Sequence, residues 1–321
     1  MRIGNLIIGT RGSDLALSQT RTVVELLKNK NENLEFAQKV ITTSGDEGFL
    51  RSPIIGTGKE AFTKEIDNAL LNGEIDLAVH SLKDIPNQDE VRKSKKHTMI
   101  ELAAFPHRES PFDVLVSKLG GQTIDSLPKG ARIGTSSVRR NIQLKSYRAD
   151  FKVVEVHGNV PTRIKKLRNG DFNLDAIVLA EAGLNRLGIN SEIDEVISPK
   201  VILPAVGQGC LAISVRSTDM STKRIVKLID DFNTRQCVSA ERRFSGEFGG
   251  GCNVPIAALA TLNRGIIKLE AMVARSTIEY SPVRNGGDLI VRQKISGSAK
   301  SPARLGKDLA LRLKKSMRAR K

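Results

Sequence analysis

The 321-residue sequence predicts α/β domains with largely parallel sheets, followed by a smaller α+β module. Three observations support this fold class. Short apolar runs alternate with helical patterns through the first two-thirds of the chain, which is typical of α/β folds. After Asp231 the pattern changes to a helix, several strands separated by turns, and a long final helix. The length also exceeds what one core usually organises, so two or three domains are expected.

The α/β part begins with the strand Asn5–Ile8 and a helix that starts at about Asp14, for which Ser13 is a suitable N-cap. A second helix, Phe62–Leu71, ends at Asn72-Gly73. The further predicted strands are Phe36–Thr42, Ile75–Val79, Val114–Val116, Arg132–Ile133, Val153–Val156, Ala176–Leu179 and Leu211–Val215, with helices at Val138–Tyr147 and Pro161–Asn169.

Between Ser44 and Lys59 the sequence SGDEGFLRSPIIGTGK has no periodicity and contains four glycines and a proline. We expect a lid loop over residues 44–60, because long loops of this kind often close over sites. The α+β part is predicted to contain a helix at Thr234–Phe244, followed by strands at Ile256–Thr261, Ile266–Val273 and Leu289–Ile295.

The net charge of +16 and pI near 9.9 favour a polyanionic partner. Aromatic residues make up only 4% of the chain, so stacking platforms for nucleic acid are scarce. Much of the excess charge lies in the last twenty residues, where a solvated amphipathic helix is the simpler interpretation. We expect no nucleic-acid partner, no membrane partner and, since no signal peptide or long apolar run is present, a cytoplasmic location.

Three widely spaced cysteines, Cys210, Cys237 and Cys252, form no disulfide framework and no zinc-binding pair. With four histidines and none at i,i+4 spacing, no metal site is expected. Cys252 follows Gly249, Gly250 and Gly251, which would leave its sulfur reachable by a bulky group. The alternative is that it is a small buried hydrophobic residue, as free cysteines usually are.

Polar and cationic residues follow four predicted strands, where ligands bind in open α/β sheets. Helix N-termini at such positions favour anions, and arginine matches carboxylates bidentately. These stretches are Thr10–Ser13, His80–Pro86, Gly134–Arg140 and His157–Arg163. Each also has a structural interpretation: the Gly-Thr-Ser-Ser run as a helix cap, Arg139-Arg140 as a solvated face, Asp84 as a turn residue and His80 as a structural histidine.

Long strings of the sequence resemble the porphobilinogen deaminase (hydroxymethylbilane synthase) family, in the family's order and nearly end to end. The matching strings are RGSDLALSQ (Arg11–Gln19), FTKEID (Phe62–Asp67), DLAVHSLKDIP (Asp76–Pro86), FPHRESPFDVLVS (Phe105–Ser117), RIGTSSVRR (Arg132–Arg140), GNVPTRIKKL (Gly158–Leu167), DAIVLAEAGLNRLG (Asp175–Gly188), LPAVGQGCLAI (Leu203–Ile213) and GGCNVPIAA (Gly250–Ala258).

The resemblance implies two α/β domains like type II periplasmic binding proteins and a smaller α+β C-terminal domain. Domain 1 would comprise residues 1–107 and 209–228, domain 2 residues 108–204, and domain 3 residues 232–321. It also implies a transferase that condenses four porphobilinogen molecules head to tail, with loss of ammonia, and releases hydroxymethylbilane. The chain would grow on one covalent dipyrromethane cofactor held by Cys252 through a thioether, in a cleft between domains, and a monomer would be the active form.

The family's functional residues carry over to matching positions. Asp84 would be the catalytic carboxylate, acting by proton transfer and by stabilising positive charge. The cofactor-binding residues would be Ser81, Lys83, Thr135, Ser136, Ser137, Arg139, Arg140 and Gly158. The substrate-binding residues would be Arg11, Ser13, Gln19, His157, Arg163, Arg186 and Gln208, with Asp46 and Lys59 on the lid loop.

Three positions depart from the family's usual residues. His157 replaces an arginine before Gly-Asn-Val, and an imidazole with a reference pKa of about 6.5 is only partly charged near neutrality. Glu60 follows Lys59 where glycine is more usual, and Cys210 replaces a small residue. The alternative to a transferase is a non-catalytic binding protein for a small polyanionic ligand, which would need neither Cys252 behind glycines nor Asp84 behind Lys83.

Overall fold

The computed structural model describes residues 5–44, 63–86, 99–249, 255–274 and 290–319. The chain divides into two compact units. Unit 1 comprises residues 1–109 and 210–235, and unit 2 comprises residues 110–209 and 236–321. Unit 1 is therefore discontinuous in sequence, because the chain leaves it for the first part of unit 2 and later returns.

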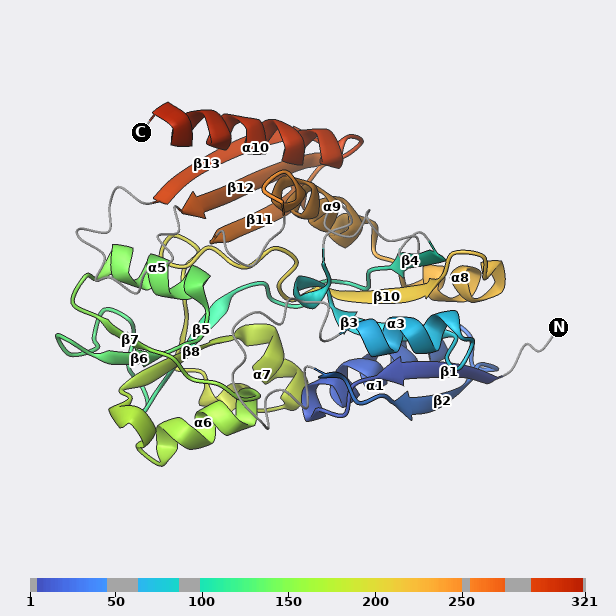
Figure 1. Ribbon diagram of the computed structural model, residues 1–321, viewed down its shortest axis with the longest axis horizontal. Coiled ribbons are helices and arrows are strands. Elements are labelled where there is room, and N and C mark those ends of the chain that lie inside the picture. The colour runs from blue at the N-terminus through green and yellow to red at the C-terminus, as the bar shows by residue number, and fades with distance from the viewer. Residues whose placement is uncertain (1–4, 45–62, 87–98, 250–254, 275–289, 320–321) are drawn as a thin grey trace. The chain divides into compact units, whose positions relative to one another are not determined.

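Unit 1 is built on a five-stranded sheet with the order β2-β1-β3-β10-β4 (Figure 1). Its strands are β1 (Asn5–Thr10), β2 (Glu35–Val40), β3 (Leu77–Ser81), β4 (Ile100–Ala104) and β10 (Leu211–Arg216). Its helices are α1 (Asp14–Lys28), α3 (Lys64–Leu71) and α8 (Met220–Val226), with short 3₁₀ turns at η2 (Leu82–Asp84) and η6 (Lys227–Ile229).

The larger sheet of unit 2 repeats this arrangement with the order β7-β6-β8-β5-β9. Its strands are β5 (Asp113–Ser117), β6 (Arg132–Gly134), β7 (Lys152–Val154), β8 (Ala176–Ala180) and β9 (Glu195–Val196). Its helices are α5 (Val138–Tyr147), α6 (Val160–Arg168) and α7 (Glu181–Leu187), with 3₁₀ turns at η4 (Asp171–Asn173) and η5 (Asn190–Glu192).

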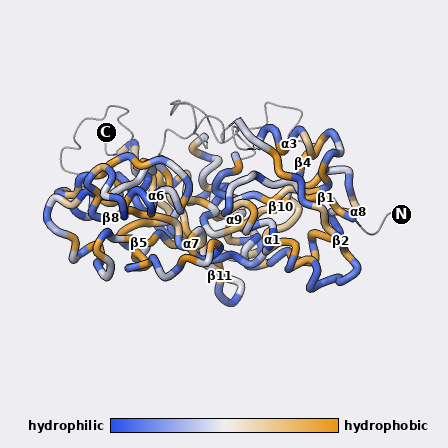
Figure 2. Tube along the Cα trace, turned by 90° about the horizontal axis from the view of Figure 1, so that it is seen from below, coloured by the Kyte–Doolittle hydropathy of each residue, from blue (hydrophilic) through white to orange (hydrophobic). Residues whose placement is uncertain are grey.

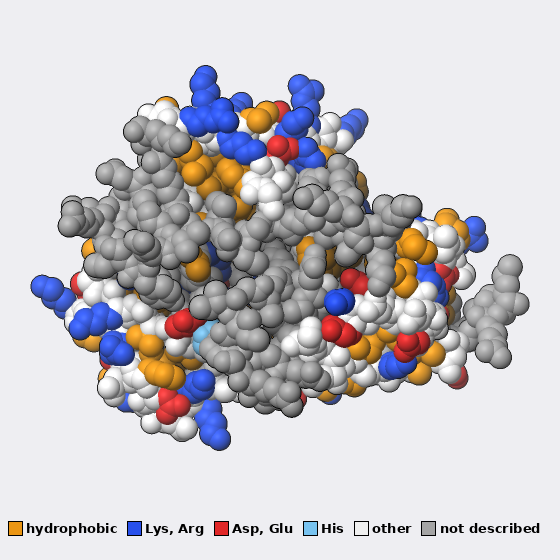
Figure 3. Space-filling view, viewed as in Figure 1, with side chains coloured by type: hydrophobic (Ala, Val, Ile, Leu, Met, Phe, Trp, Pro, Cys, Tyr) orange, Lys and Arg blue, Asp and Glu red, His pale blue; other side chains and the backbone are white. Residues whose placement is uncertain are grey.

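A smaller antiparallel sheet in unit 2 has the order β11-β12-β13 and packs against helices. It consists of β11 (Ile256–Asn263), β12 (Ile266–Ala274) and β13 (Ile290–Ser298), with α9 (Phe232–Gly246) and α10 (Pro302–Ala319). Figure 1 shows α10 lying along β12 and β13, and Leu305, Leu309 and Leu313 bury its apolar side in that core. The opposite side of α10 is rich in Lys and Arg (Figure 3), as expected for a solvated amphipathic helix.

The two five-stranded sheets are largely parallel, as predicted, but each contains one strand that runs against the other four. β1, β2 and β3 run parallel, whereas β10 is antiparallel to both β3 and β4. Likewise β6, β7 and β8 are parallel, and β5 is antiparallel to β8 and β9. The antiparallel strands are those that carry the chain into a unit from the other one. They are not joined to their neighbours by the helical crossovers that connect adjacent parallel strands.

The predicted fold class of two α/β sheets and a smaller α+β part is confirmed. The predicted start of α1 is confirmed as well, since the Ser13 hydroxyl accepts a hydrogen bond from the N–H of Ala16. Hydrophobic residues follow the central strands (Figure 2), and each sheet has buried core residues of its own. These cores fix the strand ends, and the loops at those ends carry the polar residues considered next.

Candidate functional site

A pocket of about 80 Å³ lies in unit 1 at the carboxyl ends of β1 and β3. The two strands are parallel and adjacent, so the loops that follow them meet at one edge of the sheet. The polar residues lining the pocket are Arg11, Ser13, Gln19, Thr63, His80, Ser81 and Asp84. The structure thus brings the first two predicted stretches, Thr10–Ser13 and His80–Pro86, into one site.

Asp84 reaches this pocket from the 3₁₀ turn η2 that directly follows β3. The turn is fixed by Leu82, whose side chain is buried and whose backbone N–H donates to the carbonyl of Cys210 at 3.0 Å. Lys83 and Asp84 are both half-buried. A rigid strand end therefore presents a carboxylate beside Arg11 and the hydroxyl groups of the pocket.

The floor of the pocket is hydrogen-bonded. The Gln19 amide Nε2 donates to Ser81 Oγ at 2.8 Å, and the Nε2 of buried His80 lies 3.1 Å from Ser214 Oγ. Burial, with a smaller contribution from the charge of Arg11, lowers the pKa of His80 to about 4. His80 is therefore neutral at pH 7, which agrees with the structural interpretation of this residue.

The loop between β6 and α5 in unit 2 uses its hydroxyl groups to hold its own shape. Ser137 Oγ caps α5 by accepting from the N–H of Arg140 at 3.4 Å, and Ser136 Oγ donates to the Val156 carbonyl at 2.5 Å. Thr135 Oγ1 accepts from the N–H of Ser137 at 3.2 Å. The cap interpretation of this stretch is confirmed, and it leaves Thr135 buried beneath the loop.

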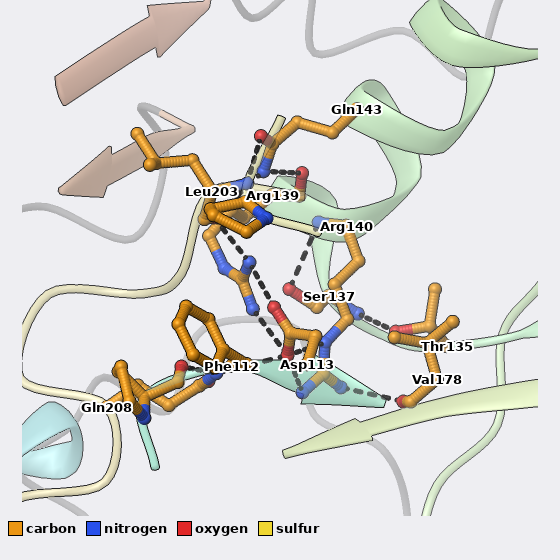
Figure 4. Close-up of polar contacts among 12 residues, drawn as sticks. Phe112, Asp113, Thr135, Ser137, Arg139, Arg140, Gln143, Val178, Leu203 and Gln208 are labelled. Atoms are coloured by element: carbon orange, nitrogen blue, oxygen red, sulfur yellow. Dashed lines mark hydrogen bonds and ion pairs between the residues drawn. The ribbon is translucent and has the colours of Figure 1, made fainter. Parts of the chain in front are cut away.

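Arg139 and Arg140 are buried, at 8% and 7% exposure, so the interpretation as a solvated face was wrong. Both guanidiniums bind Asp113, which is fully buried at the start of β5 (Figure 4). Arg139 donates to Asp113 at 2.7 and 3.2 Å, and Arg140 donates at 2.7 and 3.0 Å. Burial alone would raise the pKa of Asp113, but the two guanidiniums outweigh it and hold that pKa well below its usual range.

Asp113 is the functional candidate that sequence reasoning missed. The signal was an acidic residue directly before the apolar run Val114–Val116, where a buried strand begins. Buried charges are paired in folded proteins, so an aspartate at such a position implies a cationic partner. The sequence offers many cations, and only the fold shows that Arg139 and Arg140 are the partners.

The fourth predicted stretch forms the start of α6. Asn159 caps this helix by accepting from the N–H of Thr162 at 2.9 Å, and Arg163 Nε donates to the Gly158 carbonyl at 2.7 Å. Burial, together with the nearby charge of Arg140, lowers the pKa of Arg163 to about 10. His157 lies with its Nε2 3.1 Å from Glu155 Oε1.

Gln208 and Arg186 make hydrogen bonds at residues 208–209, where the first stretch of unit 2 (residues 110–209) ends. The Gln208 amide donates to the Pro111 carbonyl at 2.7 Å and to Asp113 at 3.2 Å, and Arg186 donates to the Gly209 carbonyl at 2.7 Å. Gln208 therefore joins Arg139 and Arg140 in binding Asp113. Arg186 instead contacts the backbone of Gly209, the residue after Gln208.

Two family models together match most of the chain. The model described as porphobilinogen deaminase, dipyromethane cofactor binding domain, matches residues 6–224, and the model of the C-terminal domain matches residues 235–315. The chain belongs to the porphobilinogen deaminase family.

Curated relatives agree with the family models. The porphobilinogen deaminase of Natranaerobius thermophilus is 42% identical over 308 residues, covering 95% of this chain and 94% of the relative. That of a Roseiflexus species is 44% identical over 306 residues, with the same coverage. Among solved structures, the substrate binding domain of a putative molybdenum ABC transporter from Clostridium difficile aligns at 14% identity over 71% of this chain and 93% of its own. The TM-score of this alignment is 0.44.

Three residues carried over from the porphobilinogen deaminase family lie outside the described residues: Cys252, Asp46 and Lys59. Within the described ranges, no cluster of three or more His, Cys, Asp or Glu residues could hold a metal ion. Among the helices of those same ranges, none combines the length and apolarity needed to cross a bilayer.

The site residues fit a dipyrromethane, whose rings carry carboxylate side chains and N–H groups. Arg11, Ser13 and Ser81 in the unit 1 pocket offer cationic and hydroxyl groups for carboxylates, and Asp84 offers a carboxylate for N–H groups. Arg139 and Arg140 of unit 2 likewise carry guanidiniums, which are groups that pair with carboxylates.

Proposed function

We propose that Asp84 is the catalytic carboxylate of the family's reaction in this chain. The chain is a transferase of tetrapyrrole biosynthesis that uses a dipyrromethane cofactor, condenses porphobilinogen molecules head to tail and releases hydroxymethylbilane. One observation carries the assignment of Asp84. Its half-buried carboxylate lines the pocket at the carboxyl ends of β1 and β3, together with Arg11, Ser13 and Ser81.

The charge types in this pocket suit the reaction. Loss of ammonia needs a proton donor and creates positive charge, and a nearby carboxylate can supply both proton transfer and electrostatic stabilisation. His80 is the other titratable group in the pocket that could move a proton. Its pKa of about 4 leaves it a neutral imidazole at pH 7, in contact with Ser214, so it carries no negative charge to stabilise the cationic intermediate. A carboxylate such as Asp84 supplies that charge as well as a site for proton transfer.

When bound through Cys252, the dipyrromethane supplies the nucleophilic pyrrole carbon on which the chain grows. The protein's contribution is then to bind carboxylates, orient rings and hold a proton near Asp84. We assign cofactor binding to Ser81, Lys83, Thr135, Ser136, Ser137, Arg139, Arg140 and Gly158. We assign substrate binding to Arg11, Ser13, Gln19, Arg163, Arg186 and Gln208, and the lid to Asp46 and Lys59.

His157 is a weaker candidate for binding a carboxylate. Its imidazole lies 3.1 Å from Glu155, so when protonated it already has an anionic neighbour. We propose that its contribution to ligand binding is smaller than that of Arg163 in the adjoining helix α6.

We also propose three domains, with boundaries at residues 1–107 plus 209–228, 108–204 and 232–321. The support is that unit 2 contains two separate sheets, each with its own buried residues. We further propose a cytoplasmic monomer, following the usual state of the family. Light scattering coupled to size-exclusion chromatography tests the monomer, and fractionation of cells tests the location.

The intact mass of the purified chain under denaturing conditions tests the proposed chemistry. We expect one dipyrromethane increment on the wild-type chain and on Asp84→Asn, and none on Cys252→Ser. On addition of porphobilinogen, further increments of one pyrrole unit should accumulate on the wild-type chain, whereas Asp84→Asn should gain them far more slowly. Equal rates in wild type and Asp84→Asn would refute the role of Asp84. A wild-type chain that gains no increment, even from preformed hydroxymethylbilane, would refute the transferase assignment.

A further inference from the structure

Asp113 lies where four segments of unit 2 meet (Figure 4). Its carboxylate at the start of β5 accepts from Arg139 and Arg140 on α5 and from Gln208. The same arginines reach two further segments, because Arg139 donates to the Leu203 carbonyl at 2.8 Å and Arg140 donates to the Val178 carbonyl on β8 at 2.9 Å. A single buried carboxylate therefore organises contacts that extend well beyond one ion pair.

The cluster carries more positive than negative charge. Two guanidiniums of 8% and 7% exposure share one carboxylate of 0% exposure. The charge of Arg140 also contributes to lowering the pKa of Arg163, so a third cation lies within electrostatic range. Buried charge that is not compensated is unfavourable, and an anionic group bound beside the cluster would relieve it.

The guanidiniums also retain donors. Their contacts with Asp113, Leu203 and Val178 comprise six hydrogen bonds. Since each guanidinium has five N–H groups, about four of the ten are not used in these contacts. Asp113 fixes the planes of both groups, and it thereby fixes the directions of those remaining N–H groups.

A purely stabilising role does not explain this arrangement. Buried ion pairs contribute little net stability compared with well-packed apolar residues, because desolvation offsets the attraction. The matching position in unit 1 shows the apolar solution. Leu211 on β10 pairs with Ser81, the last residue of β3, as Asp113 on β5 pairs with Ala180, the last residue of β8.

We propose that Asp113 is a positioning residue: it holds Arg139 and Arg140 so that their remaining N–H groups bind carboxylates of the dipyrromethane and of the growing chain. This inference rests on the proposed function. Asp113 acts through the two arginines, and Gln208 and Gln143 extend its influence to the segment at Leu203, since Gln143 accepts from the Leu203 N–H at 2.8 Å.

The test compares loading of the cofactor with thermal stability. Asp113→Asn removes the charge, Asp113→Glu keeps it but shifts it by one methylene, and Asp230→Asn is the matched control. Asp230 pairs with Arg235 at 2.6 and 2.8 Å in unit 1, and neither residue is among the proposed binding residues. For each chain, intact mass after addition of preformed hydroxymethylbilane gives the loading rate, and a melting curve gives the unfolding temperature.

We expect Asp113→Asn to load about tenfold more slowly than wild type, because misplaced binding groups lose efficiency steeply. Asp230→Asn should load like wild type even though it melts earlier. Asp113→Glu should load faster than Asp113→Asn without melting at a higher temperature. Loading that simply follows the unfolding temperature across these variants would overturn the proposal.

If Asp113→Asn does not fold, the test compares the loading rates of Asp113→Glu and Asp230→Asn, each measured the same number of degrees below its own unfolding temperature. Equal loading rates of those two variants would overturn the proposal. A wild-type chain that fails to load points instead to failure of the proposed function.

Discussion

The carboxyl ends of the two five-stranded sheets share their strand arrangement but differ in where the arginines lie. In unit 1, Arg11 precedes the N-cap Ser13 and lines an open pocket. In unit 2, Arg139 and Arg140 follow the N-cap Ser137, in the first turn of α5, and are buried.

This difference in position relative to the helix N-cap decides what each arginine needs. Arg11, in the loop before its helix, lines the pocket, whereas Arg139 and Arg140, in the first turn of α5, are buried and therefore require a counter-charge. Unit 2 provides that counter-charge as Asp113 where unit 1 has Leu211. One scaffold thus gives an open site suited to proton transfer and a fixed cluster suited to holding charge.

The largest expected effect comes from Asp84 in the open site. Asp84→Asn should lower kcat by about 10³-fold, within the range for loss of a general acid–base group. The unfolding temperature should change little, because the side chain is half-buried at a pocket edge. Steady-state rates of hydroxymethylbilane formation measure the first quantity and melting curves the second. Activity within tenfold of wild type would contradict the assignment.

The two arginine sites should respond oppositely to removal of charge. Arg139→Met should destabilise the fold by about 3 kcal/mol, because it breaks a buried pair and leaves Asp113 and the Leu203 carbonyl with fewer donors. Arg11→Met, at the half-buried edge of the pocket, should raise the KM for porphobilinogen but change stability by less than about 1 kcal/mol. Urea unfolding at pH 7 measures both stabilities, and similar losses for the two variants would remove the proposed distinction between the sites.

The sequence predicted the open site better than the buried cluster. Apolar runs and the Ser13 cap place β1, β3 and α1 correctly, and strand order then brings Arg11 and Asp84 together. The strand end was less accurate: β3 runs over Leu77–Ser81, whereas the apolar run suggested Ile75–Val79. Asp76 explains the later start, since its carboxylate accepts from the Ile7 N–H and from Arg216.

The buried cluster could not be predicted because its partners lie far apart in sequence. Asp113 precedes Arg139 by 26 residues and Gln208 by 95 residues. Periodicity reports local burial, but it does not report which cation meets which anion. β4 and β9 were missed for a related reason: β4 (Ile100–Ala104) carries a glutamate and β9 spans only two residues, so pairing with neighbours defines them more than composition does.

His80 provides a prediction about pH in the open site. Its pKa in the folded chain is about 4, and the unfolded chain should have the ordinary value near 6.5, so the unfolded chain binds the proton first as the pH falls. The contribution of neutral His80 to the free energy of unfolding is therefore fully present above about pH 6.5 and is lost as the pH falls toward 4. Between pH 6.5 and pH 5 this should amount to about 2 kcal/mol.

Comparison of histidine variants isolates that contribution. His80→Gln should lose this part of the pH dependence of unfolding, whereas His107→Gln should retain it, because the side chain of His107 is 90% exposed. Urea titrations at pH 7 and pH 5 measure the difference. Parallel pH dependence in wild type and His80→Gln would show that burial of a neutral imidazole is not responsible.

The smallest expected effect concerns the backbone beside the buried cluster. Gly158 has a φ of +118°, and a Cβ there would lie 2.8 Å from Thr162 Cγ2. Gly130 also has a positive φ, +76°, but a Cβ there would meet no atom within 4 Å. Gly158→Ala should therefore destabilise the fold by about 1 kcal/mol more than Gly130→Ala, since both carry backbone strain but only one adds a clash. Because the Gly158 carbonyl accepts from Arg163, only Gly158→Ala should also raise the KM for porphobilinogen. Equal melting temperatures and unchanged KM in both variants would mean that the loop at Gly158 can shift without moving Arg163. The fixed geometry inferred for unit 2 would then apply to Arg139 and Arg140 on α5 but not to Arg163.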